Sequence, residues 1–223
     1  MQNWFGLNFM IIAIDGTAGS GKGTLAKNLS SKLNLKHLDA GVLFRIIASQ
    51  AIKLNISNND KRLIDLCKNL TIEKVIKTEK CERKNLRSNI VGKKASEIAL
   101  NTNIRNELIN FQRKYIKFDK SLYNGVILDG RDIGTVVFPN ADYKFFLDAN
   151  VKIRAKRRTQ ELIHLNYKVI YLDVLNDLIL RDKQDTNRTV GPLLKADDAI
   201  LIDSSVKTED EVLKEALKYI KIN

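Results

Sequence analysis

Short runs of apolar residues alternate along the chain with longer stretches in which apolar residues recur at helical spacing. Short continuous apolar runs are typical of strands that are buried on both faces of a parallel sheet. Such runs, each ending at or next to an aspartate, cover 10–15, 36–39, 125–130, 144–149 and 199–203. Strands that alternate with helices favour the α/β class. The pattern therefore predicts a parallel five-stranded sheet flanked by helices.

The amphipathic stretches predict the helices that connect these strands. The expected helical stretches cover 24–33, 42–54, 94–116, 151–185 and 209–222. Within the third of them, the polar residues 101–103 predict a break, because asparagine and threonine favour turns. Residues 57–94 are more polar and lack a regular period, so we expect an irregular insert there.

The length of the chain, 223 residues, suits a single domain with one core. The first nine residues add nothing to the pattern of strands and helices, and Met10 opens the first strand directly. We therefore expect the native protein to start at Met10, which a measurement of its intact mass would test.

Composition changes this picture in one respect, a net charge of +12. Positive charge attracts nucleic acids. The lysines are scattered, however, and they form no stripe of basic and aromatic residues of the kind that binds single strands. We expect a phosphate-binding cleft within a generally basic surface, and no nucleic-acid partner.

Cysteines and histidines are few and give no sign of a metal site. Cys67, Cys81, His37 and His164 show no metal-ligand spacing, so we assign them no role and expect no disulfide. No apolar stretch approaches the ~20 residues needed to cross a bilayer. The first residues also lack the features of a signal peptide. We expect a cytoplasmic monomer with no membrane partner.

The strongest motif is a glycine-rich loop between the first strand and the first helix. It comprises Gly16, Thr17, Ala18, Gly19, Ser20, Gly21, Lys22, Gly23 and Thr24. Glycines let consecutive N–H groups point at one phosphate, and the positive end of the following helix favours the anion. Lys22 supplies a mobile charge for a transferring phosphoryl group. Strand, loop, lysine and helix together predict an ATP site in a three-layer P-loop fold.

One position of this loop departs from its general form. Gly23 stands where Ser or Thr normally follows the lysine, and Thr24 comes one residue later. We expect Mg²⁺ to accompany ATP. The sequence nevertheless assigns no magnesium ligand.

A charged cluster follows the strand at 125–130. Ligands of open α/β sheets bind beyond the carboxyl ends of the strands, where Asp129, Arg131 and Asp132 stand. The planar guanidinium of arginine suits a phosphate, and a neighbouring carboxylate accepts hydrogen bonds from amines or hydroxyls. The alternative is a polar turn with a local ion pair.

Further charged residues lie in the stretch 151–188. Arg181, Asp185 and Arg188 are spaced i, i+4 and i+7, which predicts one helix face. A solvated salt bridge explains the first two equally well. Arg154, Arg157 and Arg158 share another face, which either closes over phosphates or is solvated.

Taken together, these segments resemble the bacterial-type cytidylate kinase family of nucleoside monophosphate kinases. The resemblance extends from Met10 over nearly the whole chain. It rests on IAIDGTAGSGKGT, LDAGVLFR, LRSNIVGKKASEIA, LDGRDIGTVVFPNAD and RDKQDTNR. The fourth and fifth of these segments are quite specific to the family.

The resemblance implies roles for individual residues. Arg45 and Arg131 match ligands of the acceptor phosphate, and Arg105, Asp132 and Arg188 match residues that read the cytosine ring. Ser96, Arg181 and Asp185 match residues around the ribose. Arg157 and Arg158 match arginines near the donor phosphates, and with Lys22 and Arg131 they form the expected catalytic set. Asp39 and Asp129, each at the end of a strand, complete the substrate-binding set.

The family also implies the activity and the division of the chain. We expect ATP-dependent phosphorylation of CMP, and of dCMP, within one domain spanning 1–223. Its core would be 10–56, 118–150 and 189–223, with an acceptor-binding insert at 57–117 and a lid at 151–188. The alternatives are a kinase for another acceptor such as uridylate, and a regulatory or nucleic-acid-binding P-loop module. The carboxylates of Asp132 and Asp185 count against the second, because they repel a polyphosphate backbone.

One position departs from the family pattern. Family members usually read Asp-Ser-Gly where this chain has Asp39, Ala40 and Gly41. The family serine contacts the base, and losing one net hydrogen bond costs about 0.5–1.5 kcal/mol. We expect weaker or less selective binding of the acceptor. The insert is also shortened around 77–87.

Overall fold

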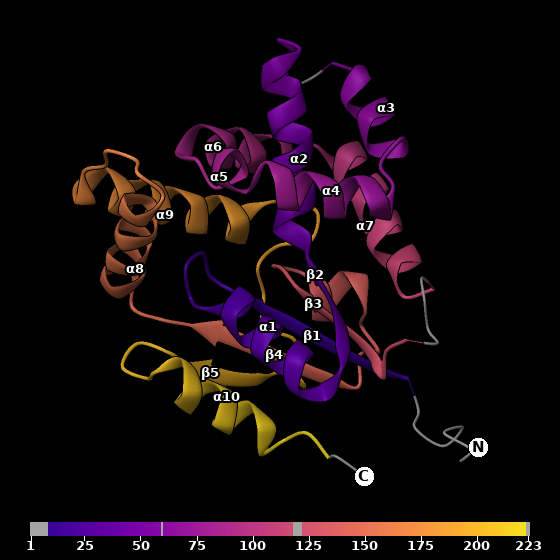
Figure 1. Ribbon diagram of the computed structural model, residues 1–223, viewed down its shortest axis with the longest axis vertical. Coiled ribbons are helices and arrows are strands. Elements are labelled where there is room, and N and C mark those ends of the chain that lie inside the picture. The colour runs from indigo at the N-terminus through magenta and orange to yellow at the C-terminus, as the bar shows by residue number, and fades with distance from the viewer. Residues whose placement is uncertain (1–8, 59, 118–121, 222–223) are drawn as a thin grey trace.

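The computed structural model describes residues 9–58, 60–117 and 122–221, and its centre is a parallel five-stranded sheet (Figure 1). The strands are β1 (Met10–Gly16), β2 (Leu35–Asp39), β3 (Gly125–Asp129), β4 (Tyr143–Asp148) and β5 (Ile200–Asp203). Their order is β2-β3-β1-β4-β5. The five apolar runs of the sequence are thus confirmed as strands. Because all strands are parallel, their carboxyl ends meet at one edge.

The strands are largely apolar because helices cover both faces of the sheet. On one face, Ile12 and Ile14 pack with residues of α1 (Lys22–Leu33) and α10 (Glu209–Leu217). On the other face, Ala13 packs with residues of α2 (Ala40–Lys53), α7 (Thr102–Tyr115) and the π-helix η1 (Ile133–Val137). The side chains of a strand alternate between its two faces. The molecule therefore has the three layers expected of a P-loop fold.

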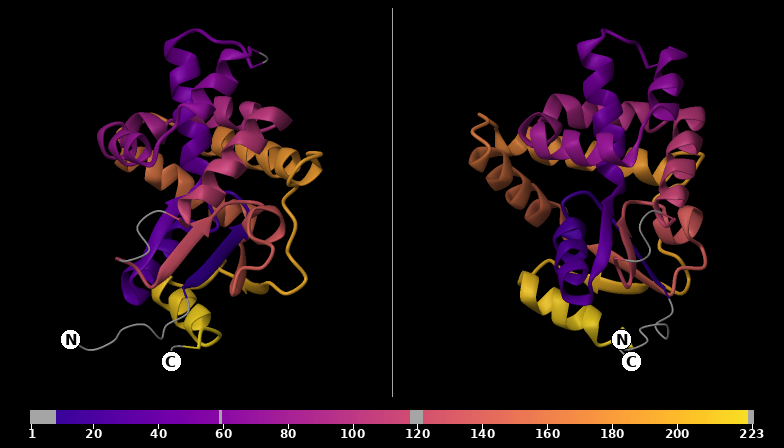
Figure 2. Two further views of the ribbon diagram at one scale, coloured as in Figure 1. Left: turned by 90° about the vertical axis from the view of Figure 1, so that its right-hand side faces the viewer. Right: turned by 45° about the vertical axis from the view of Figure 1, so that its right-hand side comes forward.

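A layer of helices stands above the carboxyl edge of the sheet. It consists of α3 (Arg62–Lys68), α4 (Ile72–Cys81), α5 (Arg83–Leu86) and α6 (Asn89–Ile98), grouped around the upper part of α2 (Figures 1 and 2). The prediction of an irregular insert was wrong. Side-chain caps from Thr71 and Ser88 begin α4 and α6, and each short helix buries only a few apolar residues against α2.

The stretch expected to be helical over 151–185 is two helices. They are α8 (Val151–His164) and α9 (Tyr171–Asn187), and the turn between them contains Asn166 in the left-handed region at φ 61°. Ala155, Leu162, Val174 and Leu178 pack with Ala18 of the glycine-rich loop. This packing places α8 and α9 beside the loop at the carboxyl edge.

The expected break at 101–103 is confirmed. Helix α6 ends at Ile98, and the side chain of Asn101 caps α7 by accepting hydrogen bonds from the backbone N–H groups of Asn103 and Ile104. This cap turns the chain between Ser96 and Arg105. The division into core, acceptor-binding insert and lid stays a prediction, because it concerns what each part binds.

The sequence also predicts a native start at Met10 and no membrane-spanning helix. The proposed start at Met10 depends on 1–9, of which 1–8 lie outside the described residues. Within the described ranges, no helix has both the length and the apolar composition required to span a bilayer.

Candidate active site

A cleft of about 680 Å³ opens at the carboxyl edge of the sheet, between the glycine-rich loop and the helices above it. Its walls come from β2, β3, α2, α6, α7, α8 and α9 as well as the loop. The cleft is lined by all of the expected catalytic and substrate-binding residues: Lys22, Asp39, Arg45, Ser96, Arg105, Asp129, Arg131, Asp132, Arg157, Arg158, Arg181, Asp185 and Arg188. Segments far apart in the sequence thus converge on one site.

The glycine-rich loop has a backbone shape that side chains would not permit. Gly16 has φ 142°, and a Cβ atom there would lie 1.8 Å from the carbonyl oxygen of Leu147. Gly19 and Gly21 also have positive φ, and Gly21 caps the start of α1. Glycine adopts these conformations without steric cost. The loop therefore directs the N-terminus of α1 into the cleft, where an anion is favoured.

Hydrogen bonds from neighbouring elements hold the glycine-rich loop in place. The Thr17 hydroxyl donates to Asp148 at 2.7 Å, and the Ser204 hydroxyl donates to the carbonyl of Ser20 at 2.8 Å. Arg154 donates to the carbonyl of Ala18 at 3.0 Å. Arg154 therefore supports the glycine-rich loop. From the sequence alone, its helix face could equally have closed over phosphates.

Lys22 lines the cleft at the start of α1 and is 6% exposed. Its Nζ donates to the carbonyl of Thr17 at 2.7 Å. Burial, followed by the charge of Arg131, lowers the pKa of Lys22 to about 7, although Asp129 opposes this shift. In the absence of a bound anion, the lysine is therefore only partly charged at neutral pH.

This pKa predicts that ATP binding takes up a proton. At about pH 8 Lys22 is largely neutral in the free protein, and the negative triphosphate raises its pKa and restores its charge. Calorimetry in buffers of different ionisation enthalpy should show uptake of up to about one proton per ATP. The uptake should vanish at about pH 6, where Lys22 is already charged. Equal uptake by a Lys22→Met variant would assign the proton to another group.

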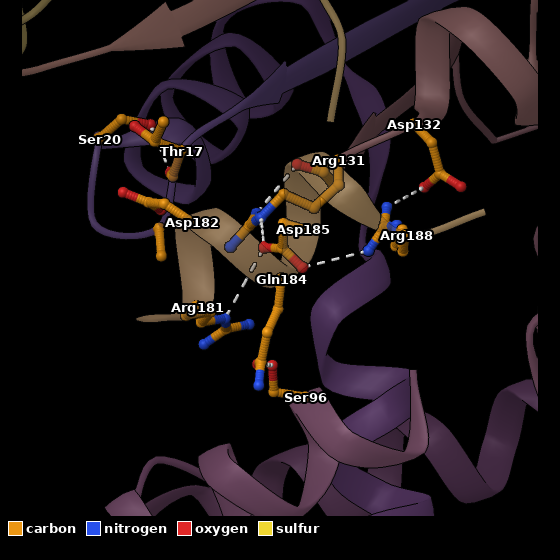
Figure 3. Close-up of polar contacts among 12 residues, drawn as sticks. Thr17, Ser20, Ser96, Arg131, Asp132, Arg181, Asp182, Gln184, Asp185 and Arg188 are labelled. Atoms are coloured by element: carbon orange, nitrogen blue, oxygen red, sulfur yellow. Dashed lines mark hydrogen bonds and ion pairs between the residues drawn. The ribbon is translucent and has the colours of Figure 1, made fainter. Parts of the chain in front are cut away.

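Asp132 occupies one end of the cleft between two buried arginines. Its Oδ2 accepts a hydrogen bond from Arg105 at 2.9 Å. Its Oδ1 lies 3.7 Å from Arg188 (Figure 3). The guanidinium of Arg105 also stacks over the ring of Phe44, 5.2 Å from its centroid. Two charged donors, one charged acceptor and an aromatic face make this corner suitable for a planar polar ring.

Backbone contacts hold this corner in place. Asp15 at the end of β1 accepts hydrogen bonds from the N–H groups of Ile133 and Gly134, at 2.8 and 2.7 Å, directly after Asp132. Arg188 also donates to the carbonyl of Gly191. Gly191 has φ 57°, and a Cβ there would lie 1.9 Å from a carboxylate oxygen of Asp132. The Asp132 carboxylate is thus enclosed by backbone as well as by arginines.

Asp185 joins three arginines in the middle of the cleft (Figure 3). It accepts from Arg131 at 2.8 Å and from Arg188 at 3.2 Å, and Arg181 approaches to 3.9 Å. Burial raises the pKa of Asp185, but these arginines outweigh burial and hold it below its usual value. The carboxylate is therefore charged at neutral pH and fixes the direction of Arg131.

Arginines outnumber acidic side chains along the cleft. Nine of them line it: Arg45, Arg83, Arg87, Arg105, Arg131, Arg157, Arg158, Arg181 and Arg188. Burial and the charges of Arg181, Arg158 and Arg87 hold the pKa of Arg45 well below its usual value. Such mutual repulsion is relieved when an anion enters, so the cleft is built to receive phosphates.

Several expected site residues have contacts that the sequence did not indicate. Helix α9 ends at Asn187, so Arg188 follows the helix in an extended conformation, and the prediction of one helix face for all three residues was wrong. The Ser96 hydroxyl donates to Gln184 at 3.0 Å (Figure 3). Arg157 donates to the backbone carbonyl of Ser204 at 2.6 Å.

Arg158 links α8 to the chain segment just before α6. It donates to Glu161 at 2.7 Å and to the backbone carbonyl of Arg87 at 2.5 Å. Arg87 in turn lies 3.6 Å from both Asp39 and Glu161. Two segments of the cleft lining that are far apart in the sequence are therefore joined directly.

The sequence indicated no role for several residues that line the cleft, among them His37, Phe44, Arg83 and Arg87, nor for Gln184, which contacts Ser96. His37 was given no role, yet it lines the cleft and its ring contacts Asp129 at 2.6 Å. Its position could have been inferred, because alternate residues of a strand share a face and His37 precedes Asp39 by two. Phe44, Arg87 and Gln184 lie within segments that carry the family resemblance, LDAGVLFR, LRSNIVGKKASEIA and RDKQDTNR, and those segments were the signal that could have indicated them.

A divalent metal ion would find few side-chain ligands among the described residues of the cleft. Among the described residues, no group of three His, Cys, Asp or Glu side chains could hold a metal ion. Magnesium is often held by substrate phosphates and water with few protein ligands. The described residues of the cleft therefore fit an ion that arrives with a nucleotide.

Comparisons with known proteins identify the family of the chain. The sequence model of the family described as cytidylate kinase matches residues 12–222. A cytidylate kinase of Clostridioides difficile strain 630 is 38% identical over 96% of this chain and 99% of its own. A cytidylate kinase of Thermosipho africanus is 40% identical over 94% of this chain and 93% of its own. The crystal structure of a sugar kinase from Janibacter matches the fold with a TM-score of 0.50 and 13% identity, covering 95% and 94% of the two chains.

Proposed function

The chain belongs to the cytidylate kinase family, and from this premise we propose that its cleft transfers the terminal phosphoryl group of ATP to CMP, and to dCMP. The observation that carries the proposal is the continuous arginine-rich cleft from the glycine-rich loop to the Asp132 corner. An oxygen of the acceptor phosphate forms a bond to the γ-phosphorus as the bond from that phosphorus to the β–γ bridging oxygen breaks. The products are ADP and a nucleoside diphosphate.

The donor side of the cleft consists of the glycine-rich loop and Lys22. In this proposal the loop N–H groups and the start of α1 bind the ATP phosphates. Lys22 leaves the carbonyl of Thr17 and follows the moving phosphoryl group. Arg157 and Arg158 are the further donor-side arginines. Both are held by other groups at present, so they must exchange those contacts for phosphate oxygens.

The acceptor side extends from the cleft centre to the Asp132 corner. Arg45 and Arg131 bind the acceptor phosphate, and Asp185 directs Arg131 towards it. Arg105, Asp132 and Arg188 read the cytosine ring. Ser96, Arg181 and Asp185 bind the ribose, while Asp39 and Asp129 orient groups at the strand ends.

No side chain has to act as a strong base in this reaction. The acceptor phosphate is already an anion, so alignment and charge stabilisation supply the catalysis. Mg²⁺, when bound together with the nucleotide, would neutralise charge on the transferring group. Closure of α8 and α9 over the cleft would exclude water, which otherwise competes as acceptor. A cytoplasmic location, a monomeric state and the absence of a nucleic-acid partner remain predictions.

Ala40 provides a test of acceptor recognition. It is buried at the first residue of α2, lines the cleft, and lies beside Gly130, whose Cβ would be 3.3 Å from the Ala40 Cβ. An Ala40→Ser variant gains a hydroxyl that can hydrogen-bond to the cytosine ring of CMP. The KM for CMP should fall about two- to tenfold, the equivalent of one net hydrogen bond. The KM for ATP serves as the internal control, and an unchanged KM for CMP would discard this explanation.

The activity itself is tested by a panel of acceptors. ADP release should be measured with CMP, dCMP, UMP, AMP and GMP, each with ATP and Mg²⁺. We expect CMP and dCMP to give the highest kcat/KM. Preference for another nucleotide would assign a different acceptor. Binding of single-stranded DNA at moderate salt, with no transfer to any nucleotide, would favour a regulatory or nucleic-acid-binding module instead.

A further inference from the structure

We propose that His37 is a positioning residue for phosphoryl transfer, which holds the Asp129 carboxylate against the start of α1. The inference rests on the proposed function and adds to it a residue that the family motifs do not include. His37 touches neither expected nucleotide directly in this assignment. It acts through Asp129 on Lys22.

The first support is the geometry of the pair. Strands β2 and β3 are neighbours, with Asp39 opposite Asp129 and His37 opposite Ile127. His37 therefore shares a face of the sheet with Asp129, and Ile127 on that face packs with Leu25 and Leu29 of α1. Nε2 of His37 lies 2.6 Å from Oδ1 of Asp129, and the two side chains are only 15% and 7% exposed.

The second oxygen of the Asp129 carboxylate faces the start of α1, which also supports the inference. Oδ2 of Asp129 lies 3.8 Å from the position of a Cβ at Gly23, the residue after Lys22. Asp129 also makes the largest acidic contribution that raises the pKa of Lys22. The carboxylate thus has one oxygen held by His37 and the other directed at the start of α1. Rotation of the carboxylate would weaken its effect on Lys22.

Asp129 is the main partner of the His37 ring. Its backbone carbonyl accepts a hydrogen bond from the hydroxyl of Tyr115 on α7 at 2.9 Å, which fixes the strand. The charged groups near its ring are Asp129 on β3, Asp39 at the end of β2 and Lys27 on α1. Burial lowers the pKa of His37, but the hydrogen bond and charge of Asp129 outweigh burial and raise it.

The function of this pair follows from the movement of Lys22 during the reaction. Lys22 must leave its contact with Thr17 for the phosphates, and Asp129 then loses part of its neighbouring positive charge. A carboxylate held by an imidazole N–H keeps its charge and its direction through that change. Preorganised groups of this kind need no rearrangement at the moment of transfer.

The test compares His37→Leu with His37→Gln, whose side-chain amide replaces the N–H donor. His37→Leu should lower kcat about tenfold, as expected for loss of one hydrogen bond to a charged group, while the KM values for ATP and CMP change less than about threefold. His37→Gln should recover most of kcat. If His37→Leu fails to fold, His37→Asn, which is polar but shorter, takes its place with the same expected loss.

Two readouts separate positioning from a merely structural role. In His37→Leu the alkaline limb of kcat/KM for ATP, to which Lys22 contributes, should move to lower pH, because Asp129 no longer supports the lysine charge. In an Asp129→Asn background, His37→Leu should have no further effect on kcat. Tyr115→Phe is the matched control, since it removes the hydrogen bond to the backbone carbonyl of His37. It should lower the stability of the fold without shifting the alkaline limb of kcat/KM for ATP.

Each result decides the inference. An unchanged kcat in His37→Leu, an unmoved or raised alkaline limb, or full additivity with Asp129→Asn would overturn it. So would a His37→Gln variant as slow as His37→Leu. Absence of CMP phosphorylation by the wild-type protein would instead reject the proposed function, independently of His37.

Discussion

Replacing Lys22 by methionine should lower kcat about a thousandfold while the affinity for ATP changes only severalfold. Lys22 is buried at the start of α1, and its Nζ is bound to the loop carbonyl of Thr17. The loop N–H groups and the N-terminus of α1 remain in the variant, and they bind the ground-state phosphates. What is lost is a mobile charge that follows the phosphoryl group only during its transfer.

Single-turnover transfer rates and equilibrium binding of ATP measure the two quantities separately. Lys32→Met is the matched control, since Lys32 lies exposed in the last turn of the same helix. We expect that control to match the wild type in both quantities. A Lys22→Met variant that binds ATP poorly but retains kcat at saturation would contradict the assigned role.

Removing the carboxylate of Asp132 should disable the acceptor site and destabilise the protein together. In Asp132→Ala, Arg105 and Arg188 lose the buried anion between them. Leaving buried charges without their partner typically costs about 3–5 kcal/mol of folding free energy. The KM for CMP should rise about a hundredfold, because the base loses an acceptor and both arginines lose their direction.

Chemical unfolding and steady-state kinetics with varied CMP test these two effects. Asp60→Ala is a suitable control, because Asp60 pairs with an Arg62 side chain that is 63% exposed. Exposed pairs contribute about 0–1 kcal/mol, so this control should remain near wild type. If Asp132→Ala keeps its KM for CMP within about threefold of wild type, the base site lies elsewhere in the cleft.

The sheet and the glycine-rich loop were predictable because their signals are local. A buried parallel strand is apolar at nearly every position, and the runs that end near Asp15 and Asp129 have this form. The loop is equally recognisable, because its positive φ angles require glycine. Such signals depend on the chain within a few residues.

The helices of the insert and the contacts of the cleft were harder to predict. Helices α3 to α5 are only four to ten residues long, and each buries only a few apolar side chains against α2. Their stability depends on tertiary packing, which a sequence pattern of this length does not reveal. The contact of Arg158 with the carbonyl of Arg87 joins segments 71 residues apart, and no pattern in either segment indicates it.

That same contact has a thermodynamic consequence. Arg158 belongs to the helix expected to meet the phosphates of ATP, whereas Arg87 precedes the helix that carries Ser96. If ATP binding breaks the hydrogen bond from Arg158 to Arg87, the segment before α6 is freed for CMP binding as well. The free-energy cost of breaking that bond then couples the binding of ATP to the binding of CMP. By linkage, each nucleotide must then change the dissociation constant of the other by one and the same factor.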